Sequence, residues 1–169
     1  MNFIFCIVIV MISTGIGRLF AGRMAQRLEF FREYQNAVTY LSDKVVGLNM
    51  ELYKALSSCR STYIRSVFMA CAYALKKTPQ TEFSDIWRQS FEQQHTDFGY
   101  LSKTDTQIIL DGGTAVEALC KNPSEKQAAL YLKRIGDYTA ALELEKVKKC
   151  KLYNTAGVLA GLMVALLVI

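Results

Sequence analysis

The side chains that could carry out chemistry in this sequence are few and scattered. Among its 169 residues there is one histidine, His95, which argues against His-based zinc sites and against Ser-His-Asp or Cys-His catalysis. The odd number of cysteines and the lack of any C-x-x-C pair argue against a disulfide framework and a zinc ribbon. These cysteines are Cys6, Cys59, Cys71, Cys120 and Cys150. No phosphate-binding glycine loop or H-E-x-x-H motif occurs. The sequence therefore predicts no enzyme activity, cofactor, metal or small-molecule substrate.

The carboxylates are the remaining candidates, and we expect them on solvated faces of helices rather than paired for acid–base catalysis. Asp105 closes the pattern Ser102-Lys103-Thr104-Asp105, a capping box that predicts the start of a helix. Gly112-Gly113 lies inside that helix and costs about 2 kcal/mol relative to two alanines. We therefore expect a kink or break at the two glycines.

Apolar residues recur at helical spacing along the whole chain, and no segment alternates as a strand does. Helix boundaries are indicated at Gly47, at Ser61 or Thr62, before Pro79, and at residues 122–124. Trp87 and Phe91, four residues apart, are expected in the core. The predicted fold is all-α: a bundle of about six helices whose first and last helices extend into two antiparallel transmembrane spans.

The two ends of the chain are strongly apolar. Residues 2–17 and 152–169 contain no charged side chain, and 18 helical residues rise about 27 Å, enough for one bilayer crossing. A cleaved signal peptide is the alternative for the first run, but no basic residue precedes it. The expected domains are an N-terminal transmembrane helix (1–22), a cytoplasmic helical bundle (23–150) and a C-terminal transmembrane helix (151–169).

Charge predicts the orientation of these spans. Residues 18–32 and 133–151 each carry a net charge of +3, whereas residues 33–132 carry −1. Because basic residues stay on the cytoplasmic side, the middle of the chain is expected in the cytoplasm and both termini across the membrane. The absence of a basic excess in the middle argues against nucleic-acid binding.

Small residues recur every four positions in both predicted spans, and such stripes allow close packing of helices in lipid. The stripes are Ser13, Gly17 and Ala21 in the first span and Gly157, Gly161 and Ala165 in the second. The alternative is that glycine is simply common in transmembrane helices.

Within the middle of the chain, charge separates into two segments. Residues 44–77 carry a net charge of +5 and residues 82–117 carry −5. Opposite charges of this kind can orient a partner protein, or they can neutralise each other inside the bundle. The candidate partner surface consists of Asp97, Asp105, Asp111 and Glu117.

The C-terminal run Lys151 to Leu162, KLYNTAGVLAGL, resembles the closing signature of the stage III sporulation protein AB family. In that family a Lys-Leu-Tyr triplet, here Lys151, Leu152 and Tyr153, enters a glycine-rich final span. Residues 49–56 fall where the family has a Pro-Leu-x-x-Ala-Leu element, with Glu51 in place of the proline. That element is similar to one in type II secretion platform proteins.

The resemblance implies a non-enzymatic platform component of a secretion-like channel required for endospore formation. It implies a multi-pass protein of the mother-cell membrane around the forespore. The implied partners are a cytoplasmic AAA-type ATPase, the stage III sporulation protein AA, and other stage III sporulation membrane proteins. The alternative is a two-span membrane adaptor or regulator unrelated to secretion.

Overall fold

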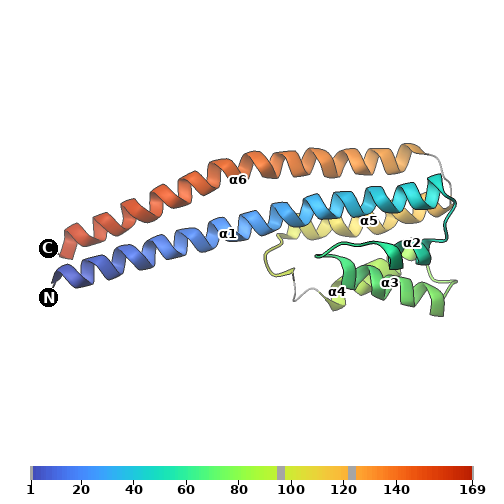
Figure 1. The fold of residues 1–169 in the computed structure, drawn as a ribbon, viewed down its shortest axis with the longest axis horizontal. Helices are drawn as coiled ribbons and strands as arrows, with labels where there is room; N and C mark the ends of the chain where they lie inside the picture. The colour runs from blue at the N-terminus through green and yellow to red at the C-terminus, as the bar shows by residue number, and fades with distance from the viewer. Residues whose placement is uncertain (1, 95–97, 122–124, 169) are drawn as a thin grey trace. The chain divides into compact units, whose positions relative to one another are not determined.

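Six α-helices and one π-helical turn make up the part of the chain that the computed structural model describes (Figure 1). Its backbone covers residues 2–94, 98–121 and 125–168, and its side chains cover 11, 12, 15–94, 98–121, 129–153, 155, 156, 159 and 163. No strand occurs in those ranges, so the all-α prediction is confirmed. The elements are α1 (Asn2–Ser42), η1 (Asp43–Gly47), α2 (Leu52–Ser58), α3 (Arg65–Lys77), α4 (Phe83–Gln93), α5 (Lys103–Lys121) and α6 (Glu125–Val168).

The chain divides into two compact units, which we describe separately. The helix pair consists of Met1–Glu29 and Ala140–Ile169, and the bundle consists of Phe30–Thr139. These boundaries follow from how the helices pack. The predicted domains 1–22, 23–150 and 151–169 follow from charge and hydropathy instead, and they stay a prediction. No helix has a stretch long and apolar enough to cross a membrane within the described residues.

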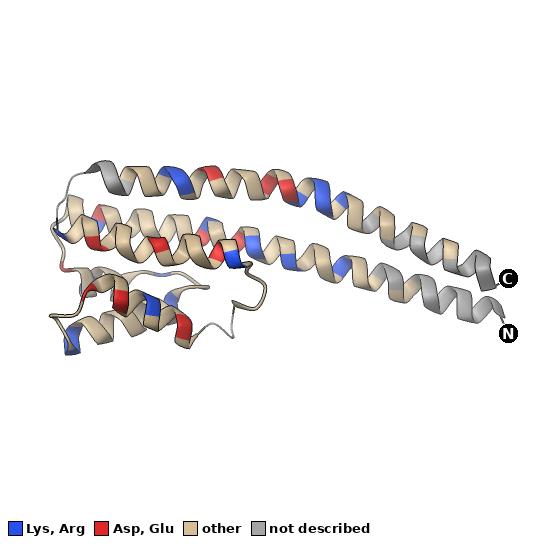
Figure 2. Ribbon diagram, turned by 180° about the vertical axis from the view of Figure 1, so that it is seen from behind, with Lys and Arg blue, Asp and Glu red and all other residues tan. Residues whose placement is uncertain are grey.

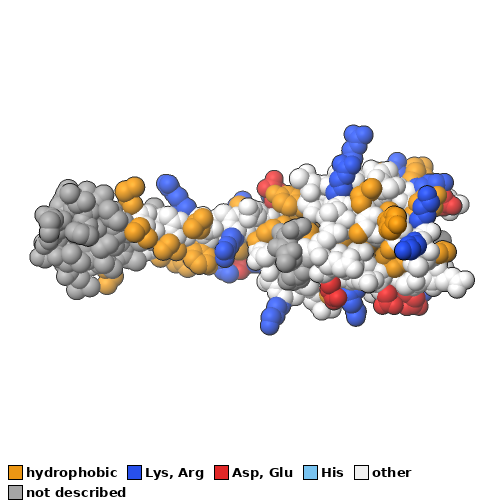
Figure 3. Space-filling view, turned by 90° about the horizontal axis from the view of Figure 1, so that it is seen from below, with side chains coloured by type: hydrophobic (Ala, Val, Ile, Leu, Met, Phe, Trp, Pro, Cys, Tyr) orange, Lys and Arg blue, Asp and Glu red, His pale blue; other side chains and the backbone are white. Residues whose placement is uncertain are grey.

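The helix pair carries exposed apolar side chains on both of its helices. Leu19 of α1 is 71% exposed and Met163 of α6 is 66% exposed. Figure 3 shows hydrophobic side chains along this unit, and Figure 2 marks basic residues at intervals on the ribbons of both helices. Further exposed members are Met11, Ile12, Ile16, Phe20, Leu152 and Leu159.

The helix boundaries in the bundle mostly follow the predicted signals. The π-helical turn ends at Gly47, and Asn49 then takes a left-handed backbone with φ of 48°, a conformation that Asn tolerates better than most residues. The Ser61 hydroxyl accepts the Ile64 N–H before α3, and α3 ends before Pro79. The fourth helix ends at Gln93.

The core of the bundle is rich in aromatic rings from α1, α3 and α4. Phe30 is fully buried and its ring lies 5.6 Å from that of Phe98, centroid to centroid. The Trp87 ring lies 5.6 Å from that of Phe68, within the range of favourable ring pairs. Trp87 and Phe91 are both buried, so their predicted place in the core is confirmed.

Three polar aromatic groups from three helices converge on two backbone carbonyls of α5. The Tyr131 hydroxyl of α6 donates to the Ile108 carbonyl at 2.7 Å, and the Tyr34 hydroxyl of α1 lies 2.8 Å from the Tyr131 hydroxyl. Tyr34 also lies within 3.3 Å of the Ile109 carbonyl, and the Trp87 indole of α4 donates to it at 2.8 Å. Burial raises the pKa of both tyrosines well above the usual 10, so they remain neutral hydroxyls.

The two glycines of α5 make this convergence possible. A Cβ at Gly112 would collide with the Tyr34 hydroxyl and lie 2.5 Å from that of Tyr131, and one at Gly113 would lie 2.6 Å from the Trp87 ring. In an α-helix the N–H groups of residues 112 and 113 bond to the carbonyls of residues 108 and 109. The missing side chains therefore expose the same two carbonyls to the three donors. We call this feature the glycine notch.

Of the predicted kink or break at Gly112-Gly113, the break is wrong, because α5 continues as an α-helix from Lys103 to Lys121. Both glycines are buried there. The low helix propensity of glycine is offset by hydrogen bonds and ring packing that any side chain would exclude.

We expect Gly112→Ala to lower the free energy of unfolding by about 2 kcal/mol or more, because the new methyl displaces two bonded hydroxyls in a packed core. Gly136→Ala is the matched control: its Cβ would meet only the flexible end of Gln35, at 3.4 Å. We expect it to be neutral or to gain up to about 1 kcal/mol from helix propensity. Denaturant unfolding followed by the fluorescence of the single tryptophan measures both. Equal stability of the two variants would contradict the notch.

Candidate functional site

The acidic residues proposed as a partner surface have different environments in the bundle. Asp105 is 0% exposed. Its carboxylate accepts the Ser102 N–H at 2.6 Å and the Tyr138 hydroxyl at 2.7 Å, and its own N–H donates to the Ser102 hydroxyl. The predicted capping box is therefore confirmed. The prediction that Asp105 presents charge on a surface is wrong, because the box and Tyr138 bury its carboxylate.

Glu117 is also buried, and it joins two helices. One carboxylate oxygen accepts the Ser84 N–H at the start of α4, at 2.9 Å, and the other pairs with Lys121. The Lys121 ammonium and Ser84 lower the pKa of Glu117 to about 2. Glu117 thus caps α4 across the bundle, and its expected place on a partner surface is wrong.

Asp111 is the remaining acid of the set within the described residues, since Asp97 lies outside them. Its carboxylate is 2.9 Å from the Arg134 guanidinium and accepts the Gln107 amide at 3.0 Å. Asp111 and Arg134 line a groove of about 440 Å³ between α5 and α6, together with the 70%-exposed Leu130. This Asp111 groove combines a charged rim with an apolar side chain.

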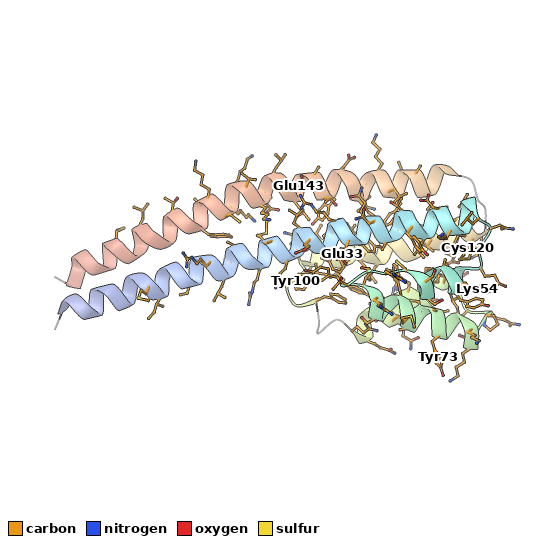
Figure 4. All side chains as sticks on the ribbon, viewed as in Figure 1. Glu33, Lys54, Tyr73, Tyr100, Cys120 and Glu143 are labelled. Atoms are coloured by element: carbon orange, nitrogen blue, oxygen red, sulfur yellow. The ribbon has the colours of Figure 1, made fainter. Side chains whose placement is uncertain are left out.

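A further acidic residue, Glu33, has a structural role that the sequence did not indicate. Its carboxylate accepts the Ser61 hydroxyl at 3.0 Å and the Thr62 N–H at 2.8 Å, directly before α3. Figure 4 shows Glu33 on α1. The residues are 28 and 29 positions apart, so no local motif could have revealed the contact.

The small-residue stripes can be followed only in part. Gly17 is buried, and a Cβ there would lie 2.9 Å from the backbone carbonyl oxygen of Tyr153, whereas Gly22 has nothing within 4 Å. Ala21 is half-buried. Of the other stripe residues, the side chains of Ser13, Gly157, Gly161 and Ala165 lie outside the described residues.

The Lys-Leu-Tyr signature contributes to the same contact between α1 and α6. The Tyr153 ring lies 5.7 Å from that of Phe20, centroid to centroid, and the Tyr153 backbone lies beside Gly17. Lys151 and Leu152 are exposed. An ion pair between Arg27 and Glu145, at 3.8 Å, joins the two helices farther along. The tyrosine of the signature is therefore a helix-contact residue.

No group of three or more His, Cys, Asp or Glu side chains that could hold a metal occurs among the described residues. The cysteines described are free thiols, with Cys59 and Cys71 buried and Cys120 exposed. Burial raises the pKa of the Cys71 thiol to about 11, which leaves it in the unreactive thiol form at neutral pH.

The comparisons with known proteins point to one family. A family model described as stage III sporulation protein AB matches residues 2–169. The comparisons with curated proteins and with solved structures found no match.

We expect Glu117→Gln to make the free energy of unfolding less dependent on pH, because the variant has no carboxyl at this position that acid can protonate. The folded pKa of about 2 lies below the usual glutamate value of 4.5, so the contribution is present above about pH 4.5 and is lost as pH falls towards 2. Between pH 7 and pH 3 the wild-type chain should lose more stability than the variant. Glu92→Gln, an exposed acid on α4, is the control. Parallel stability curves for wild type and Glu117→Gln would contradict the assignment.

We expect Gly17→Leu to separate the helix pair, because the side chain would enter the space of a backbone carbonyl that cannot rotate away. Gly22→Leu is the matched control, since it adds the same side chain at an open position of the same helix. Thiol cross-linking between Phe20→Cys and Tyr153→Cys, in a chain with its own cysteines replaced, measures the contact. Efficient cross-linking in both glycine variants would show that Gly17 is not a contact position.

Proposed function

The chain belongs to the stage III sporulation protein AB family, and we propose that it acts as a non-enzymatic membrane component of a secretion-like channel between mother cell and forespore. The family match over residues 2–169 carries this proposal and gives the chain a role in stage III of sporulation. The finer role in the channel follows from what the family resemblance implies.

The support for a membrane position comes from the sequence and from the surface of the helix pair. The uncharged runs 2–17 and 152–169 are flanked by the basic segments 18–32 and 133–151. The apolar side chains exposed on the helix pair suit contact with lipid rather than water. In this proposal the bundle lies in the cytoplasm and both termini lie across the mother-cell membrane.

The proposed partner is a cytoplasmic AAA-type ATPase, the stage III sporulation protein AA. The chain has no nucleotide-binding motif, as expected of a receptor for an ATPase. We place the docking site at the Asp111 groove, because Asp111 is the described member of the predicted acidic surface that is not buried. The exposed Leu130 adds an apolar anchor at the same groove.

Co-purification from sporulating cells tests both parts of this proposal. The full chain should fractionate with membranes and, after detergent extraction, retain the ATPase. Asp111→Asn should weaken retention, and the loss should shrink with added salt. Arg134→Gln is the matched control, since it breaks the same ion pair but keeps the acid.

Recovery of the chain in the soluble fraction would overturn the membrane position. Equal ATPase retention by wild type and Asp111→Asn would exclude this groove, and no retention by wild type would favour the adaptor alternative.

A further inference from the structure

The outer face of α3 carries basic residues at its two ends and apolar side chains between them. The exposed positions repeat every three or four residues, so they lie along one side of the helix. Met69 is 45% exposed and Tyr73 is 71% exposed, and Figure 4 shows Tyr73 on α3. The stripe consists of Arg65, Met69, Tyr73 and Lys76.

The outer face of α4 carries acidic residues at its two ends. Asp85 lies in the first turn and Glu92 in the last, and both are exposed. Arg88 and Gln89 are exposed between them. Figure 3 shows this side of the bundle, with acidic, basic and hydrophobic side chains all on its surface.

The two stripes lie on neighbouring helices and reach similar levels along them. α3 and α4 are consecutive packed helices, and the Phe68 ring of α3 contacts the Trp87 ring of α4. Residues 78–82 join the two helices, and the Thr81 N–H donates to the Thr78 carbonyl at 3.2 Å in a turn that reverses the chain, so the helices run antiparallel. Counted from this turn, Lys76 is level with residue 84, next to Asp85, and Arg65 lies within one helical turn of Glu92.

The charges at the ends of the two stripes form no ion pair with one another in the described part of the chain. The ion pairs of the bundle involve other residues, such as Lys54 with Glu51 and Arg134 with Asp111. The basic residues at the ends of the α3 stripe and the acidic residues at the ends of the α4 stripe can therefore pair with another molecule that presents the opposite charges.

We propose that the outer face of α3 and α4 binds a second copy of this chain about a two-fold axis that runs parallel to the two helices. Such an axis places α3 of each copy over α4 of the other at unchanged level. Arg65 then faces Glu92 of the second copy, Lys76 faces its Asp85, and Tyr73 faces its Arg88, a cation–π arrangement. Each contact occurs twice.

The charge pattern favours a second copy over other partners. An anionic lipid surface or a nucleic acid would attract α3 but would be repelled by the acidic residues of the adjacent α4. A second copy offers acidic residues to the α3 stripe and basic residues to the α4 stripe at the same time, and it also covers Met69 and Tyr73. This proposal goes beyond the role in sporulation and does not depend on it.

Single charge reversals at one matched pair test the proposal without weakening either helix. Glutamate in place of Arg65 lies near the start of α3, and lysine in place of Glu92 lies near the end of α4, where the helix dipole favours each new charge. Self-association of the detergent-solubilised full chain is measured by light scattering over a concentration series at low salt. We expect Arg65→Glu and Glu92→Lys each to weaken association by about tenfold or more, because like charges then meet at two places.

Restoration of the pairing is the decisive readout. An equimolar mixture of the Arg65→Glu and Glu92→Lys chains, or one chain that carries both substitutions, should associate as wild type does. Lys133→Glu, an exposed reversal on α6, should leave association unchanged. A monomeric wild-type chain, association that survives Arg65→Glu, or failure of both combinations to restore it would each overturn the proposal. Association lost equally in Lys133→Glu would overturn it as well, by showing an effect of overall charge.

Discussion

The bundle depends on the approach of three polar aromatic side chains to the backbone of one helix. Tyr34, Trp87 and Tyr131 come from α1, α4 and α6, and all three reach the carbonyls of residues 108 and 109 through the glycine notch. A buried hydroxyl or indole N–H without a partner would cost about 1–3 kcal/mol, so these bonds constrain where the three helices can lie. α5 is thereby fixed at the centre of the bundle.

The other helix ends of the bundle are held by carboxylates from distant parts of the chain. Glu33 accepts donors before α3, Glu117 accepts the N–H of Ser84 in α4, and Asp105 joins the start of α5 to Tyr138. These acids therefore stabilise the fold, and Asp105 and Glu117 are withdrawn from the surface. Among the charges left exposed are those on α3, on α4 and beside the Asp111 groove, and these surfaces carry both proposals for binding.

The sequence predicts the helices, the capping box and the buried Trp87 and Phe91, because these depend on local spacing and local hydrogen bonds. It does not predict the notch, since helix propensity gives a cost for Gly112-Gly113 but cannot show which rings pack over them. Asp105 and Glu117 were expected on the surface because their charge is visible in the sequence, whereas Tyr138 and Ser84, which bury them, are 33 positions away. Long-range contacts of this kind require the fold.

A double-mutant cycle between Gly112→Ala and the pair Tyr34→Phe and Tyr131→Phe tests the notch most directly. If Gly112 exists to admit the two hydroxyls, then removing them also removes the collision with the alanine methyl. The cost of Gly112→Ala in free energy of unfolding should therefore fall by about 1 kcal/mol or more in the phenylalanine background. The same cost in both backgrounds, to within about 0.3 kcal/mol, would show that the glycine and the hydroxyls act independently and would contradict the central role of the notch.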